Sequence, residues 1–289
     1  MFTTLISTET LAAHLDGSCV IVDCRYDLRN EGWGREQYLI GHIPGAVYAS
    51  LSHDLAAPPS GSNGRHPVPC VEEIEATFGR LGIGSDAQVV IYDQDTGMFA
   101  SRMWWMLRYL GHEAAAVLDG GWAKWTREGR PVRAGDEQRP AAVFAGHRQK
   151  DLRLPLDQVK AAIGDPAVLL VDARAPERFE GKSEPLDRTP GHIPGAVNHF
   201  YKRNISDEGV MLPPNTLRRQ FDEVLAGRRP DQVVMYCGSG VSACHNLLAM
   251  EHAGLTGAKL YPGSWSEWSS DPQRPVETGP GKLKLESEK

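Results

Sequence analysis

The chain has 289 residues, of which 41% are hydrophobic and 24% charged, and its formal net charge is −6. This composition is typical of a soluble globular protein, and the length fits two domains or one large one. No Lys/Arg-rich run is present, which argues against nucleic acid as a partner. No apolar run approaches the ~20 residues that span a bilayer, which argues against a membrane protein.

In chain order, the first segment, Met1-Phe2-Thr3-Thr4-Leu5-Ile6-Ser7, lacks the basic start, apolar core and cleavage site of a secretory signal. The five cysteines form no CxxC pair, and such a low number does not suggest a disulfide framework. The spacing also gives no support for a structural zinc site. We therefore expect a cytoplasmic protein that holds no metal.

Short apolar runs then alternate with amphipathic stretches. Residues 20–22 and 168–171 are β-rich and predict buried strands, whereas residues 103–109 and 246–252 predict helices. Strands that alternate with helices predict an α/β fold with a parallel sheet covered on both faces. Residues 51–69 predict a long loop, a kind of segment that often carries function.

The chain repeats itself once. The run Gly-His-Ile-Pro-Gly-Ala-Val at 41–47 returns at 191–197, and Val-Asp-Cys-Arg at 22–25 returns as Val-Asp-Ala-Arg at 171–174. Such a long repeat predicts two copies of one domain rather than a solenoid. We place the domains at 1–135 and 151–276, separated by a polar linker at 136–150 that contains Gly and Pro. We expect the C-terminal tail, 277–289, to be poorly ordered.

One repeated position differs chemically. Val-Val-Ile-Tyr-Asp, ending at Asp93, returns as Val-Val-Met-Tyr-Cys, ending at Cys237. Glycines at 238 and 240 and a helix beginning near Ser242 follow Cys237, so its thiol should lie at a strand's carboxyl end beside a helix N-terminus. That setting favours the nucleophilic thiolate, although a buried inert cysteine is the alternative. Asp93 lies in an acidic loop, which we expect to bind an anion poorly. The first domain is therefore expected to be a non-catalytic scaffold.

The paired Gly-His-Ile-Pro-Gly-Ala runs, the Asp-x-Arg strand ends and the Cys237 loop resemble the rhodanese superfamily over residues 5–276. The loop Cys-Gly-Ser-Gly-Val-Ser-Ala at 237–243 is most similar to that of 3-mercaptopyruvate sulfurtransferases, which usually have Thr where Ser242 stands. The resemblance implies two rhodanese-like domains, each a mainly parallel sheet flanked by helices on both faces. The N-terminal domain is then non-catalytic and the C-terminal domain catalytic.

The resemblance also implies a reaction. Cys237 takes sulfur from 3-mercaptopyruvate as a persulfide, pyruvate leaves, and the sulfur passes to a thiol acceptor such as thioredoxin or to cyanide. It implies no metal or organic cofactor, and a monomer.

Residue roles carry over in the same way. The resemblance implies that Arg178 and Arg188 hold the substrate carboxylate, and that the loop residues Gly238, Gly240, Val241 and Ser242 surround the sulfur. A serine, a histidine and an acid act together in the family, and these match Ser239, His66 and, with a shift of two positions from Ser52, Asp54. Each arginine could instead be a surface charge, and His66 an ordinary loop residue.

Three alternatives fit the sequence less well. A thiosulfate sulfurtransferase would have the same fold, but those enzymes usually carry basic residues after the cysteine, where this chain has Gly238 and Ser239. A cysteine phosphatase needs Cys-x5-Arg, whereas position 243 is Ala. A non-catalytic binding module would not require the intact Cys237 loop.

Because His42 and His192 occur in both halves, we expect them to be structural.

Overall fold

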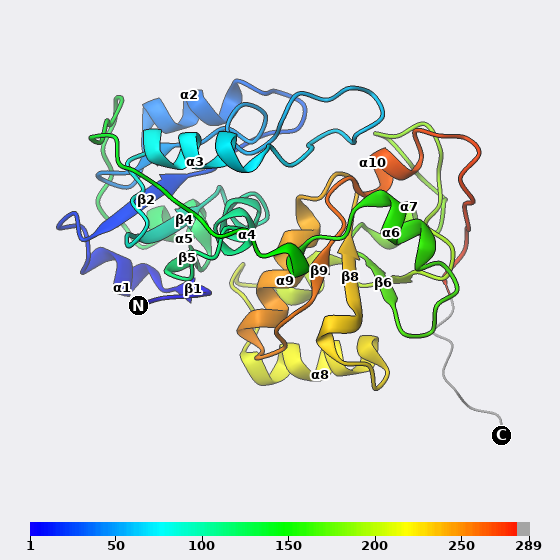
Figure 1. Cartoon of the computed structure of the whole chain (residues 1–289). Helices are drawn as coiled ribbons and strands as arrows, with labels where there is room; N and C mark the ends of the chain where they lie inside the picture. The colour runs from blue at the N-terminus through cyan, green and yellow to red at the C-terminus, as the bar shows by residue number, and fades with distance from the viewer. Residues whose placement is uncertain (282–289) are drawn as a thin grey trace. The chain divides into compact units, whose positions relative to one another are not determined.

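The computed structural model describes residues 1–281, and in it the chain forms two compact units (Figure 1). The first unit contains Met1–Pro58, Val68–Lys150 and Ile205–Met211. The second contains Pro59–Pro67, Asp151–Asn204 and the described residues from Leu212 onward. The part of the predicted tail at 282–289 lies outside the described residues.

The first unit is built on a five-stranded parallel sheet with the order β1-β5-β4-β2-β3. Its strands are β1 (Leu5–Ile6), β2 (Cys19–Asp23), β3 (Val47–Tyr48), β4 (Gln88–Tyr92) and β5 (Ala115–Leu118). Its helices are α1 (Thr8–Ala12), α2 (Trp33–Ile40), α3 (Val71–Arg80), α4 (Ala100–Tyr109) and α5 (Gly121–Arg127).

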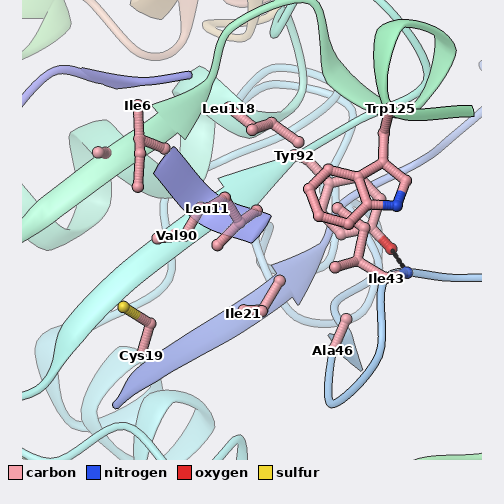
Figure 2. Packing of buried hydrophobic residues seen from close by; sticks show 11 residues of the cluster. Ile6, Leu11, Cys19, Ile21, Ile43, Ala46, Val90, Tyr92, Leu118 and Trp125 are labelled. Atoms are coloured by element: carbon pink, nitrogen blue, oxygen red, sulfur yellow. Dashed lines mark hydrogen bonds between the residues drawn. The ribbon is translucent and has the colours of Figure 1, made fainter. Parts of the chain in front are cut away.

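Both faces of this sheet are covered. Figure 2 shows one face, where Ile21 and Tyr92 pack with Leu11 of α1 and Trp125 of α5. Because side chains alternate along a strand, the intervening residues point to the other face, where the sulfur of Cys24 contacts Met103 of α4. Every residue of β2 is buried, as expected for a central parallel strand.

The second unit repeats this plan with a four-stranded parallel sheet in the order β7-β6-β8-β9. Its strands are β6 (Leu169–Asp172), β7 (Val197–Asn198), β8 (Val233–Tyr236) and β9 (Lys259–Leu260). Its α-helices are α6 (Leu156–Ala161), α7 (Pro176–Phe179), α8 (Pro214–Leu225), α9 (Ser242–His252) and α10 (Ser264–Trp268). Short 3-10 turns lie at Lys150–Leu152, Tyr201–Asn204 and Pro230–Gln232.

Helices again lie on both faces. Val234 and Tyr236 of β8 pack with Phe179 of α7 and Trp265 of α10. On the opposite face, Met235 contacts Asn246 of α9 through its sulfur. The predicted fold class is therefore confirmed in both units, and α9 begins at Ser242 as predicted.

The repeated motifs have the same structural role in both units. Arg25 forms an ion pair with Asp23, and its Nη2 donates a 2.6 Å hydrogen bond to the Gly41 carbonyl oxygen. Arg174 does the same with Asp172 and with the Gly191 carbonyl at 2.7 Å. Each buried pair thus ties the end of a strand to the following Gly-His-Ile-Pro turn.

The two repeated histidines are structural. His42 and His192 are fully buried, and the Nδ1 atom of each is hydrogen-bonded to a backbone carbonyl, at 2.8 and 2.7 Å respectively. The His42 ring stacks on Tyr38 and the His192 ring on Phe179. These contacts fix both rings within the core of their units.

The segment at 136–150 packs on the first unit. The Ala142 amide donates to the Gly79 carbonyl at 2.9 Å, and the Gly146 amide donates to Glu75 at 2.8 Å. The predicted domain limits stay a prediction.

Within residues 1–281, no helix has the length and apolar composition needed to cross a lipid bilayer.

Candidate active site

Cys237 directly follows β8 and is buried, with 2% of its surface exposed. Its amide donates a 3.1 Å hydrogen bond to Ser264 Oγ, and its carbonyl accepts a 2.9 Å bond from the Trp265 amide. Both backbone groups of Cys237 are therefore fixed by the start of α10. Trp265 is itself fully buried in the core and donates its indole N–H to the Thr189 carbonyl at 2.8 Å.

Ser264 is a supporting residue that sequence reasoning missed. It is fully buried and has φ of 55°, which is unusual for a residue other than glycine. The equivalent residue in the first unit is Gly121, with φ of 54°. A Cβ on Gly121 would lie 2.8 Å from the Asp93 carbonyl oxygen, so a side chain fits only in the second unit. The signal was present in the repeat, as Gly-Gly-Trp changing to Gly-Ser-Trp.

The loop between Cys237 and α9 is shaped by Gly240. Its φ is +73°, and a Cβ there would overlap the Pro262 carbonyl oxygen, so only glycine fits. Val241 is buried, and Ser242 begins α9. Cys244, one turn into the helix, donates its thiol to the Gly240 carbonyl at 3.3 Å and so holds the loop against the helix.

The corresponding loop of the first unit surrounds an anion of its own. The Asp93 carboxylate accepts hydrogen bonds from the amides of Gly97 at 2.9 Å and Phe99 at 2.8 Å, with further bonds from Asp95 and Ala100. Burial, together with the nearby Asp95 charge, raises the pKa of Asp93 to about 6. Burial and the Asp95 charge therefore outweigh the stabilising effect of these amide hydrogen bonds on the Asp93 carboxylate. That this loop is a poorer site for an anion than the Cys237 loop stays a prediction.

Ser239 and His66 are brought together. His66 Nδ1 lies 2.8 Å from Ser239 Oγ, and Ser239 is 7% exposed. His66 comes from Pro59–Pro67, which is part of the second unit although it precedes most of the first unit's sequence. The Arg65 amide donates to Ser266 Oγ at 3.0 Å, which anchors this segment at α10.

Asp54 belongs to the first unit. Its carboxylate accepts a 2.7 Å hydrogen bond from the Ser50 amide and forms an ion pair with Arg80 of α3. Asp54 and Arg80 line a cavity of about 830 Å³ whose lining residues all come from the first unit. The proposed role of Asp54 together with His66 stays a prediction.

Arg178, at the end of α7, is held by a buried carboxylate. Its Nε and Nη2 donate to Glu184 at 3.2 and 2.6 Å. Burial by itself would raise the pKa of Glu184, but the hydrogen bond and charge of Arg178 outweigh it and hold that pKa below its usual value. The third nitrogen, Nη1, lies 3.5 Å from where a Cβ of Gly238 would stand. Arg178 therefore points toward the Cys237 loop.

Arg188, which the sequence suggested, and Arg65, which it did not, differ in their contacts. Arg188 is exposed, and in the part of the chain that the structure describes it forms no hydrogen bond or ion pair. Arg65, which sequence reasoning did not select, forms an ion pair with Asp187, and its Nη2 lies 2.8 Å from the Cβ position of Gly238. The only signal was its position beside His66.

A family model, the rhodanese-like domain, matches residues 7–128 and 155–271, and the chain belongs to this family. A probable 3-mercaptopyruvate sulfurtransferase of Pseudomonas aeruginosa is 42% identical over 278 residues, covering 95% of this chain and 98% of that protein. A putative thiosulfate sulfurtransferase of Mycobacterium tuberculosis is 39% identical, covering 90% of each. The solved structure of a 3-mercaptopyruvate sulfurtransferase from Leishmania major matches with a TM-score of 0.83 and 30% identity, covering 92% of this chain and 74% of that one.

Proposed function

We propose that this protein transfers sulfur from 3-mercaptopyruvate to a thiol or cyanide through a persulfide on Cys237. The observation that carries this proposal is the convergence, at one loop, of a cysteine fixed at both backbone groups, a hydrogen-bonded Ser239–His66 pair and the Arg178 guanidinium. The names of the relatives from Pseudomonas aeruginosa and Leishmania major support the same donor.

The first step is attack by the Cys237 thiolate on the donor sulfur. A bond forms between the two sulfur atoms, and the bond between the donor's sulfur and C3 breaks. Its electron pair moves onto C3 as the enolate of pyruvate. The attacking sulfur follows β8 and precedes the N-terminus of α9, which begins at Ser242, and a helix N-terminus is a favourable place for negative charge.

The second step is protonation of the enolate at C3, which yields pyruvate. The Ser239 hydroxyl can donate this proton and be reprotonated by His66, because their side chains are 2.8 Å apart. Asp54 is our candidate for the acid that would complete the triad. Arg178 meanwhile holds the donor's carboxylate, since a guanidinium matches a carboxylate with two parallel hydrogen bonds.

The alternative is thiosulfate as the donor. It is favoured by the name of the Mycobacterium tuberculosis relative and by the two guanidinium groups beside Gly238, which would suit any small anion. With thiosulfate the leaving group is sulfite, which needs no proton from Ser239. The serine and histidine contact therefore favours 3-mercaptopyruvate.

We further propose a cytoplasmic monomer that passes its sulfur to a thiol such as thioredoxin and needs no cofactor. All five cysteines are free thiols, which suits a reducing compartment and a sulfur carrier that must be discharged by a thiol.

The test is a side-by-side assay of the purified protein with 3-mercaptopyruvate and with thiosulfate, using cyanide as the acceptor. We expect a higher kcat/KM for 3-mercaptopyruvate and pyruvate released in equal amount to the sulfur transferred. A preference for thiosulfate would retain Cys237 as the carrier and overturn the proposed donor and the proton-donating role of Ser239.

A further inference from the structure

We propose that Arg65 is the second cation of the donor-anion site, so that Arg65 and Arg178 together hold the donor's negative group over Gly238. The identity of the donor rests on the function proposed above, but the anion site itself rests on geometry. Both arginines lie in the second unit, because Pro59–Pro67 belongs to it.

The two guanidinium groups converge at Gly238. A Cβ on this glycine would lie 2.8 Å from Arg65 Nη2 and 3.5 Å from each Nη atom of Arg178. Arg65 Nη2 and Arg178 Nη1 form no hydrogen bond within the described residues, whereas the other side-chain donors of Arg178 are engaged by acidic groups. Two unused charged donors therefore face the residue that follows Cys237.

Asp187 shows what kind of group fits between these arginines. Its Oδ1 pairs with Arg65 Nη1, and its Oδ2 lies 3.5 Å from Arg178 Nη2. The Asp187 side chain is only 6% exposed, so one buried carboxylate already bridges the two cations. A donor with a carboxylate can bridge the same two groups from the side that faces Gly238, and Asp187 keeps both guanidinium groups in place for it.

Arg65 is held firmly enough to act as a binding residue. Its amide donates to Ser266 Oγ, and a Cβ on the preceding Gly64 would lie 2.8 Å from the Gly263 carbonyl oxygen, so this backbone packs closely on the start of α10. The same short turn of α10 fixes Cys237 through Ser264. Arg65 and the attacking sulfur are thus positioned by one element.

The first experiment measures kcat and KM for 3-mercaptopyruvate in Arg65→Gln, Arg178→Gln, Arg188→Gln and, as a matched control, Arg218→Gln. Arg218 is an exposed arginine of α8 that pairs with Asp222. We expect the Arg65 variant to raise KM by about tenfold or more, the range for a lost charge-assisted hydrogen bond, with a smaller change in kcat. Arg65→Lys should recover part of the loss, since the charge remains.

The second experiment is independent of sulfur transfer. It compares the rates at which iodoacetate and iodoacetamide alkylate Cys237, followed by mass spectrometry of the peptide that contains it. The two reagents differ mainly in charge, so their rate ratio reports the anion site. We expect wild type to react faster with iodoacetate than with iodoacetamide. In Arg65→Gln and in Arg178→Gln, the logarithm of this rate ratio should fall by at least half.

The outcomes separate this inference from the proposed function. If wild type does not use 3-mercaptopyruvate but Arg65→Gln lowers the alkylation ratio, the donor assignment fails and the anion site stands. If wild type uses 3-mercaptopyruvate, but Arg65→Gln matches Arg218→Gln in both experiments, the inference is overturned. A large effect of Arg188→Gln without one of Arg65→Gln would overturn it as well.

Discussion

His66 Nδ1 lies 2.8 Å from Ser239 Oγ, although 173 positions separate the two residues in the sequence. This contact places a titratable ring beside the hydroxyl that follows Cys237 by two residues. The contact bears on the choice of donor, because the pyruvate enolate released from 3-mercaptopyruvate needs a proton and the sulfite released from thiosulfate does not.

Ser239→Ala and His66→Gln should therefore lower kcat for 3-mercaptopyruvate by about 100-fold, because the pyruvate enolate loses its proton donor. The rate with thiosulfate should fall far less, since sulfite leaves without a proton. The double variant should be little worse than either single variant, as expected of groups that act together. Steady-state assays with both donors check this, and equal losses for the two donors would contradict it.

Cys237→Ser should abolish sulfur transfer and leave the fold intact, because its backbone hydrogen bonds to Ser264 and Trp265 do not involve the sulfur. Cys70→Ser is the matched control, since Cys70 is an exposed thiol that should not carry sulfur. Mass spectrometry after incubation with the donor should show one added sulfur atom in wild type and in the Cys70 variant. Activity or sulfur loading in Cys237→Ser would disprove the mechanism.

Arg178→Ala should raise KM for 3-mercaptopyruvate by about tenfold or more and affect thiosulfate use less, because the α-keto acid loses a bidentate carboxylate contact. The variant also leaves the buried Glu184 with Arg174 as its remaining guanidinium partner. A thermal unfolding curve should therefore accompany the kinetics. Equal losses for both donors in a well-folded variant would argue against a carboxylate contact.

Ser264→Ala should destabilise the second unit by about 1–3 kcal/mol, since the buried Cys237 amide loses its acceptor while the unusual φ remains. Ser264→Gly loses the same hydrogen bond but relieves about 1 kcal/mol of backbone strain, so its loss should be smaller. Both should slow sulfur transfer. In the first unit, Gly121→Ser should lower stability because its Cβ would meet the Asp93 carbonyl. Urea unfolding of the three variants checks the order.

His199 predicts how stability depends on pH. Burial lowers the pKa of this ring to about 4, although its hydrogen bond to Asn204 favours the charged form. At the His199 site the unfolded chain then binds more protons between about pH 6.5 and pH 4, so the contribution of His199 lowers stability within this window by at most about 3 kcal/mol. Asp93 contributes with the opposite sign, because its pKa is raised to about 6 in the folded chain, and the effect of His199 is therefore read as the difference between wild type and a His199 variant.

Urea unfolding from pH 7.5 to 4.5 measures that loss. His199→Gln should lack this loss, because glutamine does not titrate, so wild type should lose stability relative to the variant as the pH falls. His53→Gln, at an exposed histidine, should leave the slope unchanged. A wild-type slope equal to that of His199→Gln would show that another group is responsible.

The sequence by itself determined the fold class and the duplication, and it singled out Cys237 as the candidate sulfur carrier. These depend on local properties, because β-rich runs, helical periodicity and a repeated Asp-x-Arg strand end are read along the chain without knowing what lies opposite. Cys237 was identifiable because the second copy of the repeat has a cysteine where the first has Asp93. The resemblance to the rhodanese superfamily then supplied Ser239, His66 and Arg178.

The tertiary structure decided which distant side chains meet at the Cys237 loop. Residues 59–67 lie in the first half of the sequence but pack in the second unit, and this brings Arg65 and His66 to Gly238 and Ser239. No periodicity encodes such a contact, because it depends on the close backbone approach of Gly64 to α10. For the same reason the sequence favoured Arg188, which directly precedes the second Gly-His-Ile-Pro run along the chain. Arg65 is far from the Cys237 loop in the sequence and approaches it only in space.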